Sequence, residues 1–302
     1  MRLRALAKIN LGLDVIRKRE DGYHEVRMIM QTIRMYDQLD ITRALNPGIR
    51  LTTNLPYLPV NENNLVYKAA KLLMDEFEIK DGLSVQLKKV IPVSAGMAGG
   101  SSDAAAALVG VNKIFSLGLS RQELMERATL IGADVPYCVM RGTALAEGIG
   151  EILTPLPPVP KGYVLVGKPG ISVSTKMVYG KLDAAGLEEH PDIDGMVEAL
   201  KQNDFKKVAA KLGNVLETVT VPAYPIISEI KKKMIEWGAV NALMSGSGPT
   251  VFGLFDDREK AEYASEKLKK SRLVRQSFLT TFYNVPNCTG KERKNGGNTN
   301  DI

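Results

Sequence analysis

The sequence predicts an α+β protein built from two domains. Segments with the two-residue alternation of strands and segments with helical spacing both occur along the 302 residues, but they do not alternate regularly, which favours α+β over a doubly wound sheet. A composition of 44% hydrophobic and 25% charged residues is typical of a globular chain. The proline-rich stretch 155–160 is the best candidate for a linker, so we predict domains over residues 1–158 and 159–284. Residues 285–302, rich in Asn, Gly and Lys, are predicted to form a disordered tail.

The first domain is predicted to begin with strands. Apolar side chains alternate with basic ones over residues 2–15, and a polar turn at 18–22 leads into a second strand over 23–33. Helical spacing of apolar residues predicts a helix over 63–77. Pro136 is expected to end a helix, because the residue before a proline is biased toward extended geometry. The other elements expected here are a strand over 83–91, helices over 102–115 and 121–130, and strands over 137–146 and 151–153.

The second domain is predicted to mix both kinds of element. An apolar run predicts a strand over 163–167, and a helix-prone segment follows at 174–180. Glycines and serines at 245–249 are typical of a connection between two strands. The remaining elements expected are helices over 195–201, 225–237 and 257–270, and strands over 240–244, 250–255 and 273–283.

Charge and cysteine content narrow the function classes. The formal charge of +6 and the pI near 9.1 come from basic residues spread along the chain, and the basic triplet 231–233 falls in a predicted amphipathic helix. This diffuse positive charge is sufficient for binding an anionic small molecule. A protein that binds nucleic acid stays an alternative, and it predicts a steep loss of affinity as the salt concentration rises.

No apolar run approaches the roughly 20 residues of a membrane helix. Cys138 and Cys288 lie far apart without metal-ligand spacing, so we expect reduced thiols, a cytoplasmic protein and a buried, inert Cys138 in a strand.

The clearest chemical signal is a glycine-rich turn between a predicted strand and a predicted helix. From Pro92 to Ser102 it reads Pro-Val-Ser-Ala-Gly-Met-Ala-Gly-Gly-Ser-Ser. Its glycines permit positive φ and close approach of the backbone to a ligand, and its two serines are good N-caps for the alanine-rich helix that follows. Amides at a helix start bind phosphate well. Because the turn contains neither a GxxxxGK[ST] motif nor a lysine, we expect it to cradle a nucleotide phosphate while a cation comes from elsewhere.

Several segments together resemble one family. The turn over 92–104 resembles the phosphate-binding motif of the GHMP kinases, which include galactokinase and homoserine, mevalonate and phosphomevalonate kinases. Other motifs occur in the expected order, and the resemblance covers residues 1 to about 283. It implies a two-domain GHMP kinase fold with the active site in the interdomain cleft. The further motifs are Ala7-Lys8-Ile9-Asn10-Leu11, Asp21-Gly22-Tyr23-His24-Glu25, Gly132-Ala133-Asp134-Val135-Pro136 and Met244-Ser245-Gly246-Ser247-Gly248-Pro249-Thr250.

The resemblance implies a catalytic pair. Taken alone, Asp134 is a turn residue and Lys8 an exposed strand lysine. By resemblance, Asp134 is the base that accepts the proton of the acceptor hydroxyl as this oxygen attacks the γ-phosphoryl group of ATP. Lys8 pairs with Asp134, keeps its carboxylate ionised and supplies the cation that the turn lacks. The ATP-binding residues implied are Pro92, Val93, Ser94, Ala95, Gly96, Met97, Ala98, Gly99, Gly100, Ser101 and Ser102.

The resemblance also implies an acceptor alcohol that carries a cytidine diphosphate group. Tyr23 and His24 are expected to meet its cytosine, and Tyr179 matches the position of a second aromatic residue that stacks on the base. Asn10 and Thr175 are expected to hold the hydroxyl groups of the alcohol. The glycine-rich support loop, residues Ser245, Gly246, Ser247 and Gly248, is expected to close on the active site.

Cofactor, assembly and a second acceptor class complete the expectation. Mg²⁺ is expected to neutralise the β- and γ-phosphates, with the Ser102 hydroxyl as its protein ligand. The assembly is expected to be a monomer or a homodimer without nucleic acid or membrane. A kinase of the same family that acts on homoserine or mevalonate remains an alternative, and it would not need Tyr23, His24 and Tyr179. We expect phosphorylation of the 2-hydroxyl of the cytidine-linked alcohol, in the non-mevalonate route to isoprenoid precursors.

Overall fold

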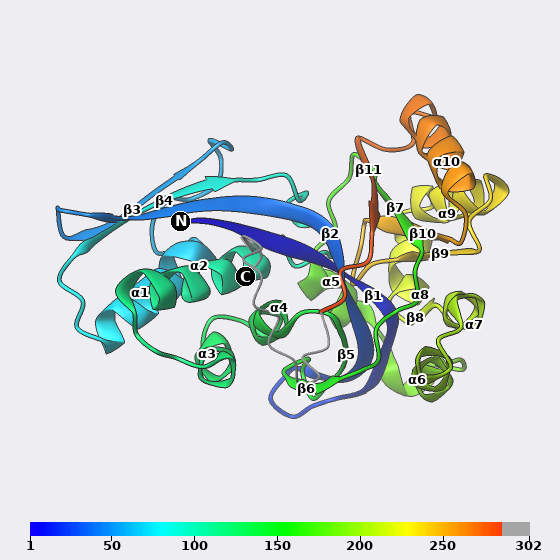
Figure 1. Cartoon of the computed structure of the whole chain (residues 1–302). Helices are drawn as coiled ribbons and strands as arrows, with labels where there is room; N and C mark the ends of the chain where they lie inside the picture. Colours follow the sequence, from blue (N-terminus) through cyan, green and yellow to red (C-terminus); the bar gives the residue numbers. More distant parts are fainter. Residues whose placement is uncertain (286–302) are drawn as a thin grey trace.

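The structure is a computed structural model that describes residues 1–285, so the tail predicted over 285–302 lies outside the described residues except for Val285. Within the described part of the chain the strands form two sheets, and helices cover both (Figure 1). The larger sheet has the order β3-β4-β2-β1-β8, with β5 paired to β2 and β6 paired to β5. Its strands are β1 (Arg2–Lys18), β2 (His24–Ala44), β3 (Gly48–Thr53), β4 (Gly82–Lys88), β5 (Thr143–Glu147), β6 (Ile152–Pro155) and β8 (Gly213–Asn214).

The two long antiparallel strands β1 and β2 form the centre of this sheet. β2 continues to Ala44, beyond the predicted end at residue 33, and the alternation of buried and half-exposed side chains continues with it. In β1, by contrast, most residues from Ala5 to Val15 are buried on both faces. The β1–β2 register shifts between Leu6 and Lys8 and again between Asn10 and Gly12. Such bulges turn side chains out of the regular alternation, and here they flank two of the predicted site residues.

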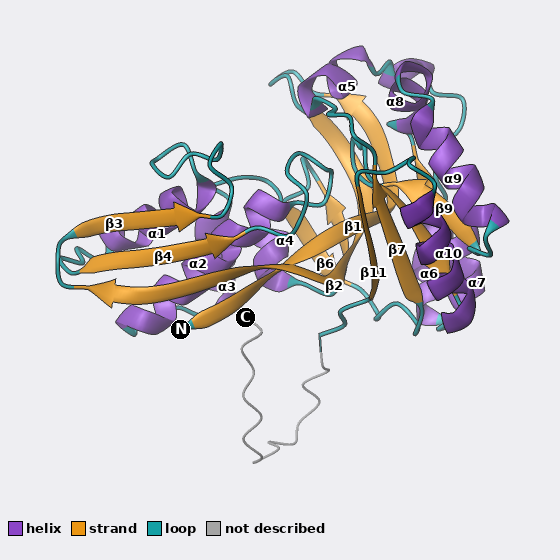
Figure 2. Ribbon diagram, turned by 90° about the horizontal axis from the view of Figure 1, so that it is seen from above, coloured by secondary structure: helices purple, strands orange, loops and turns teal. Residues whose placement is uncertain are grey.

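Helices α1 and α2 pack against each other and cover the larger sheet on the face that α3 and α4 also approach (Figure 2). Consecutive alanines in α2 are fully buried and let this helix lie close to β1 and β2. The Asn64 side chain caps α1 by accepting a hydrogen bond from the Val66 amide at 2.9 Å. These helices are α1 (Leu65–Glu76), α2 (Gly99–Phe115), α3 (Arg121–Ala128) and α4 (Val135–Met140).

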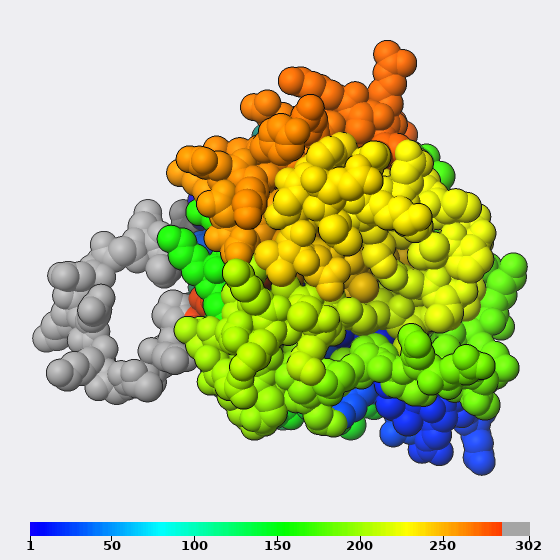
Figure 3. Space-filling model, turned by 90° about the vertical axis from the view of Figure 1, so that its right-hand side faces the viewer, coloured from blue at the N-terminus to red at the C-terminus, as the bar shows by residue number. Residues whose placement is uncertain are grey.

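The smaller sheet belongs to the second half of the chain and has the order β11-β7-β10-β9. Helices α9 and α10 pack on it, and Figure 3 shows segments of the second half covering this face of the molecule. Its strands are β7 (Tyr163–Lys168), β9 (Asn241–Met244), β10 (Val251–Phe255) and β11 (Gln276–Thr281). The helices of this half are α5 (Thr175–Lys181), the 3₁₀ turn η1 (Ala184–Gly186), α6 (Ile193–Lys201), α7 (Phe205–Ala210), α8 (Glu217–Ala223), α9 (Ile226–Glu236) and α10 (Arg258–Lys270).

The two halves are joined by more than the proline-rich stretch between β6 and β7. β8 pairs in parallel with β1 at Gly12 and Leu13, and an isolated bridge joins Ile33 of β2 to Phe282. Helix α6 also packs on β1 and β2. The boundary predicted near residue 158 falls in the connection between the two sheets and stays a prediction. None of the helices within residues 1–285 has the length and apolar character that crossing a bilayer requires.

Two expectations about local structure were wrong around Pro136. This proline begins a helix instead of ending one: it occupies the first turn of α4, where its missing amide hydrogen costs nothing and its fixed φ suits the helix. Residues 137–140 therefore belong to α4, and the strand starts only at Thr143. Cys138 lies in this helix as a free, buried thiol, and burial raises its pKa. The inert character expected of it is consistent with this environment.

Candidate active site

Most of the predicted site residues line one cavity of about 1010 Å³. This volume is at the upper end of the range usual for small-molecule sites. The cavity is lined from the first half of the chain by β1, β2 and the 92–101 turn, and from the second half by α5 and the support loop. Predicted residues that line it are Lys8, Asn10, Tyr23, His24, Pro92, Val93, Ser94, Ala95, Gly96, Ala98, Gly99, Gly100, Ser101, Asp134, Thr175, Tyr179, Gly246 and Ser247.

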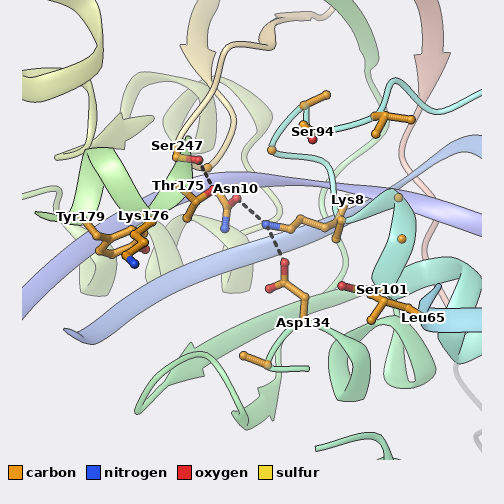
Figure 4. A pocket seen from close by; sticks show the side chains of 18 of the residues that line it. Lys8, Asn10, Leu65, Ser94, Ser101, Asp134, Thr175, Lys176, Tyr179 and Ser247 are labelled. Carbon is orange, nitrogen blue, oxygen red and sulfur yellow. Dashed lines mark hydrogen bonds and ion pairs between the residues drawn. The ribbon is translucent and has the colours of Figure 1, made fainter. Parts of the chain in front are cut away.

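Lys8 and Asp134 face each other in this cavity (Figure 4). Their Nζ and Oδ2 atoms are 3.8 Å apart, and the Lys8 side chain is 7% exposed against 33% for Asp134. Lys8 Nζ also donates to Oδ1 of Asn10 at 2.8 Å. The shifted register of β1 and the start of α4 together place an ammonium group, a neutral amide and a carboxylate side by side. Lys8 is thus a nearly buried lysine, because the cavity wall covers it, and not the exposed strand residue that its position suggests.

Asp134 is held at the start of α4, where it is the N-cap residue without a side-chain capping bond. Its carboxylate is consequently not used by the helix and remains directed into the cavity (Figure 4). A negative charge at a helix N-terminus is favoured by the helix dipole. Pro136 in the first turn favours the start of a helix at this point, so the sequence itself determines that Asp134 lies at the N-terminus of α4.

The turn that precedes α2 is strained in a way that exposes its backbone. Ser94, Gly96 and Ala98 all have positive φ, of 50°, 73° and 53°. For the serine and the alanine this conformation costs roughly 1 kcal/mol or more each, a type of strain found at ligand sites. Helix α2 begins directly after Ala98, which has no side-chain cap, so the first amides of the helix are left for a ligand. Exposed amides at a strained turn and a helix start are an arrangement that suits an anionic group such as phosphate.

The serines of this turn differ from their predicted roles. Helix α2 begins at Gly99, so Ser101 and Ser102 lie inside its first turn and are not N-caps. Ser101 lines the cavity, whereas Ser102 is 2% exposed and donates its hydroxyl hydrogen to the carbonyl of Leu6 at 2.6 Å. The Ser102 hydroxyl is therefore hydrogen-bonded within the core and does not line the cavity. This corrects the expectation that Ser102 is a metal ligand. Three further residues that were expected in the site, Met97, Ser245 and Gly248, also do not line the cavity.

The support loop contacts the turn directly. The Ser245 hydroxyl donates to the carbonyl of Gly96 at 2.9 Å, and a Cβ on Gly96 would lie 2.1 Å from the Ser245 carbonyl oxygen. Asn214 of β8 holds the loop from behind by donating to the carbonyls of Met244 and Gly246, both at 2.8 Å. The close approach of the two loops explains why position 96 requires glycine.

A buried cluster beneath the turn was missed by the sequence analysis. Lys89 lies between Asp37 and Asp103, forming an ion pair with each, and the Lys89–Asp103 distance is 2.6 Å. Oδ1 of Asp37 accepts hydrogen bonds from the amides of Val90 and Ile91, the latter at 2.8 Å. Lys89 and Asp103 both line the cavity. Lys89 directly follows β4 and continues its alternation in phase with the buried Leu83 and Leu87. A lysine on the buried phase was therefore a signal in the sequence that could have indicated this cluster.

The far end of the cavity carries aromatic rings. The rings of His24 and Tyr179 are tilted against each other with centroids 5.2 Å apart, whereas Tyr23 is 60% exposed at the rim. Burial lowers the pKa of His24, so its ring is neutral at physiological pH and offers one donor and one acceptor. Thr175 Oγ1 lies 2.8 Å from the Ser247 hydroxyl, which links α5 to the support loop. Further lining residues that were not predicted include Lys18, Leu58, Pro59, Asn63, Asn64, Leu65 and Lys176.

Comparisons with known proteins agree on one family. The model of the GHMP kinases N terminal domain matches residues 64–142, and that of the GHMP kinases C terminal domain matches residues 196–273. A 4-diphosphocytidyl-2-C-methyl-D-erythritol kinase of Lachnospira eligens is 56% identical over 280 residues, covering 93% of this chain and 97% of the relative. One of Alkaliphilus oremlandii is 52% identical over 283 residues, covering 93% and 96%.

Solved structures give the same result for the fold. A crystal structure of 4-(cytidine 5'-diphospho)-2C-methyl-D-erythritol kinase superposes with a TM-score of 0.81 at 32% identity, covering 93% of this chain and 99% of the other. A homoserine kinase from Cytophaga hutchinsonii has a TM-score of 0.72 at 19% identity, covering 92% and 94%. At that identity the second similarity concerns the fold alone. The two-domain α+β architecture expected from the sequence is confirmed.

Proposed function

Because this chain belongs to the GHMP kinases, and within them to the 4-diphosphocytidyl-2-C-methyl-D-erythritol kinases, we propose that it transfers the γ-phosphoryl group of ATP to the 2-hydroxyl of 4-diphosphocytidyl-2-C-methyl-D-erythritol. The products are the 2-phosphate and ADP, in the non-mevalonate route to isoprenoid precursors. The observation that carries the proposal is the Lys8–Asp134 pair, which shares one cavity with a strained, amide-exposing turn.

Asp134 acts as the general base in this proposal. Its carboxylate accepts the proton of the acceptor hydroxyl while the oxygen attacks the γ-phosphorus and the bond to the β-phosphate oxygen breaks. Lys8 keeps the carboxylate oriented and places a positive charge where negative charge develops on the transferring group. Asn10 fixes Lys8 by accepting the 2.8 Å hydrogen bond at Oδ1. Its amide nitrogen donates to Sδ of Met28 at 3.2 Å, and its second hydrogen is the one proposed to bind a hydroxyl group of the alcohol.

The triphosphate is bound by backbone groups. The amides of the turn and of the first turn of α2 face the cavity and act on phosphate oxygens without a lysine inside the turn. Mg²⁺ fits this site as an ion held mostly by substrate phosphates and water, because no cluster of three His, Cys, Asp or Glu side chains suited to a metal exists among residues 1–285. Ser101 lines the cavity at the start of α2, and its hydroxyl is the ligand that we propose for such an ion. When bound, Mg²⁺ neutralises charge on the β- and γ-phosphates.

The cytosine is placed at the aromatic end. Tyr179 offers a ring face for stacking, His24 offers one donor and one acceptor, and Tyr23 closes the rim. Thr175 is proposed to hold a hydroxyl of the alcohol from the other side of the cavity. The buried, free thiol of Cys138 suits a reducing compartment, and we expect the reaction to take place in the cytoplasm.

The variant Asp134→Asn tests the role of Asp134 as the general base. Loss of a positioned base typically costs about 10²- to 10⁴-fold, so we expect kcat to fall by about 10³-fold while the Kd for ATP changes less than about twofold. Asp81→Asn, at an exposed aspartate that does not line the cavity, is the matched control. Turnover of Asp134→Asn close to that of the wild type would exclude the proposed role.

The acceptor is tested by ADP release with three alcohols. We expect turnover with 4-diphosphocytidyl-2-C-methyl-D-erythritol and at least about 10³-fold lower kcat/KM with homoserine or mevalonate, because only the first provides a base for the ring pair. A preference for either small alcohol would instead assign the chain to another GHMP kinase activity. Measurable binding to DNA or RNA at low salt, lost as salt rises, would favour the nucleic-acid alternative.

A further inference from the structure

Two of the four lysines that line the cavity have no acidic partner among residues 1–285. Lys8 faces Asp134, and Lys89 lies between two buried aspartates. Within the part of the chain that the structure describes, no carboxylate lies within ion-pair distance of Lys18 or Lys176, although both line the cavity. The carboxylates that line the cavity are thus each paired with a lysine. Among the described residues, the positive charge of the cavity that has no paired carboxylate belongs to Lys18 and Lys176.

Both lysines lie next to the aromatic end of the cavity. Lys18 is the last residue of β1 and is directly opposite His24 in the β1–β2 register. Lys176 lies in the first turn of α5, three residues before Tyr179 and therefore on the same face of the helix. The His24 and Tyr179 rings are 5.2 Å apart, so the lysines approach this ring pair from two different elements. The positive charge of Lys18 adds to burial in lowering the pKa of His24, which indicates that its field reaches the ring.

The cavity has an order along its length. In Figure 4, Ser94 and Ser101 lie at one end, Lys8 and Asp134 follow, and Lys176 with Tyr179 lies at the other end. When the reacting alcohol of the acceptor lies at Asp134 and its cytosine lies at the ring pair, the diphosphate that links them must lie between these two points. A diphosphate carries at least two negative charges, which need counter-charges when they leave bulk water.

We infer that Lys18 and Lys176 bind the diphosphate of the acceptor and thereby select alcohols that are linked to a nucleoside through a diphosphate. This inference rests on the proposed function. No bond forms or breaks at either lysine; both act on binding of the acceptor. Because both side chains are exposed, solvent screens each contact, and the two contributions are expected to be modest and similar. Binding to the phosphates is also expected to weaken as the salt concentration rises.

The decisive measurement compares cytidine diphosphate with cytidine as competitive inhibitors against the acceptor. Cytidine occupies the ring pair but lacks the diphosphate, so it reports the integrity of that end of the cavity. We expect Lys18→Met and Lys176→Met each to raise Ki for cytidine diphosphate by roughly 3- to 10-fold, and the double variant by roughly 10- to 100-fold, with Ki for cytidine unchanged within twofold. KM for the acceptor follows Ki for cytidine diphosphate, whereas KM for ATP and kcat stay within about twofold.

Lys181→Met is the matched control, because Lys181 is exposed at the end of α5 and does not line the cavity. Lys176→Arg should restore most of the affinity for cytidine diphosphate, since it restores the charge. Equal loss of cytidine and cytidine diphosphate affinity, or no loss of either in the double variant, overturns the inference while the proposed function stands. A wild-type protein that fails to phosphorylate the cytidine-linked acceptor overturns the proposed function and the inference together.

Discussion

Replacing Asp37 with asparagine is expected to destabilise the protein far more than the same replacement of Asp103. Both carboxylates contact Lys89, and all three side chains are at most 4% exposed. The difference lies in what else each carboxylate does. Asp37 also accepts the amide hydrogens of Val90 and Ile91, whereas Oδ1 of Asp103 has no hydrogen-bond partner among the described residues.

The magnitudes follow from these contacts. In Asp37→Asn an amide nitrogen, which is a donor, replaces one of the two carboxylate oxygens. This nitrogen faces either the Lys89 ammonium or the two backbone amides, which are donors as well, so at least one donor–donor contact is left inside the protein. Breaking a buried ion pair costs about 3–5 kcal/mol, and because Lys89 keeps Asp103 as a partner we expect about 3 kcal/mol. In Asp103→Asn the amide nitrogen takes the place of the unpartnered oxygen, and Asp37 still neutralises Lys89, so the expected cost is about 1 kcal/mol or less.

Thermal unfolding and ATP kinetics test this difference. A loss of about 3 kcal/mol corresponds to a fall in Tm of roughly 6–12 °C for a chain of this size class, against about 4 °C or less for Asp103→Asn. Because Asp37 anchors Val90 and Ile91, which lead into the 92–101 turn, Asp37→Asn should also raise KM for ATP, measured at a temperature where the variant is folded. A Tm within about 1 °C of the wild type for Asp37→Asn, or equal losses in the two variants, would refute the reasoning.

Three further predictions concern the same region of the molecule. Gly96→Ala should raise KM for ATP by about tenfold or more, because a Cβ would lie 2.1 Å from the Ser245 carbonyl oxygen at a φ of +73°; unchanged ATP kinetics would contradict the contact. Burial raises the pKa of Asp103 well above the usual value of 3.8, and the nearby Asp37 carboxylate adds to this. The folded state therefore binds this proton more tightly than the unfolded state, so the stability that the group contributes is greatest at low pH and declines as pH rises above 3.8 toward the folded pKa. The urea concentration at the midpoint of unfolding should fall less from pH 5 to pH 8 in Asp103→Asn than in the wild type. An equal fall in the two proteins would contradict the raised pKa of Asp103. Cys138 should stay unlabelled by a thiol reagent in the native protein and react after unfolding, as followed by peptide mapping; labelling of the native protein would show that the thiol is accessible.

The sequence predicted the elements whose pattern is local. Alternation in the first strand, the apolar spacing of α1 and the glycine-rich turn each depend on neighbours within a few residues, and the structure has these three close to the predicted bounds. Pro136 was misinterpreted because a proline fits both after the end of a helix and in its first turn, and only the packing of α4 decides between them. The strand β3 was not predicted, because it is mostly exposed and lacks a strong apolar pattern.

The site residues were predictable to the extent that they belong to contiguous motifs. Lys8 and Asp134 were paired by family resemblance, since nothing in the spacing of two residues so distant in sequence brings them together. Lys89 and Ser102 show the limit of this approach. The alternation of β4 could have placed Lys89 on the buried side, but the sequence does not show which partner a buried lysine or a helix serine has. Tertiary contacts with Asp37 and with the Leu6 carbonyl decide this.

Because the short strand β8 comes late in the sequence, the larger sheet can be completed only late in synthesis. β1 is among the first segments to leave the ribosome, yet its neighbour on the side opposite β2 comes from Gly213–Asn214. At roughly 5–20 residues per second, the nascent chain carries the unpaired backbone of β1 at Gly12 and Leu13 for about 10–40 s. An open strand edge of this kind is a template for pairing with other chains. The edge of β1 at Gly12 and Leu13, which begins two residues beyond Asn10, is therefore closed only after most of the chain has been made.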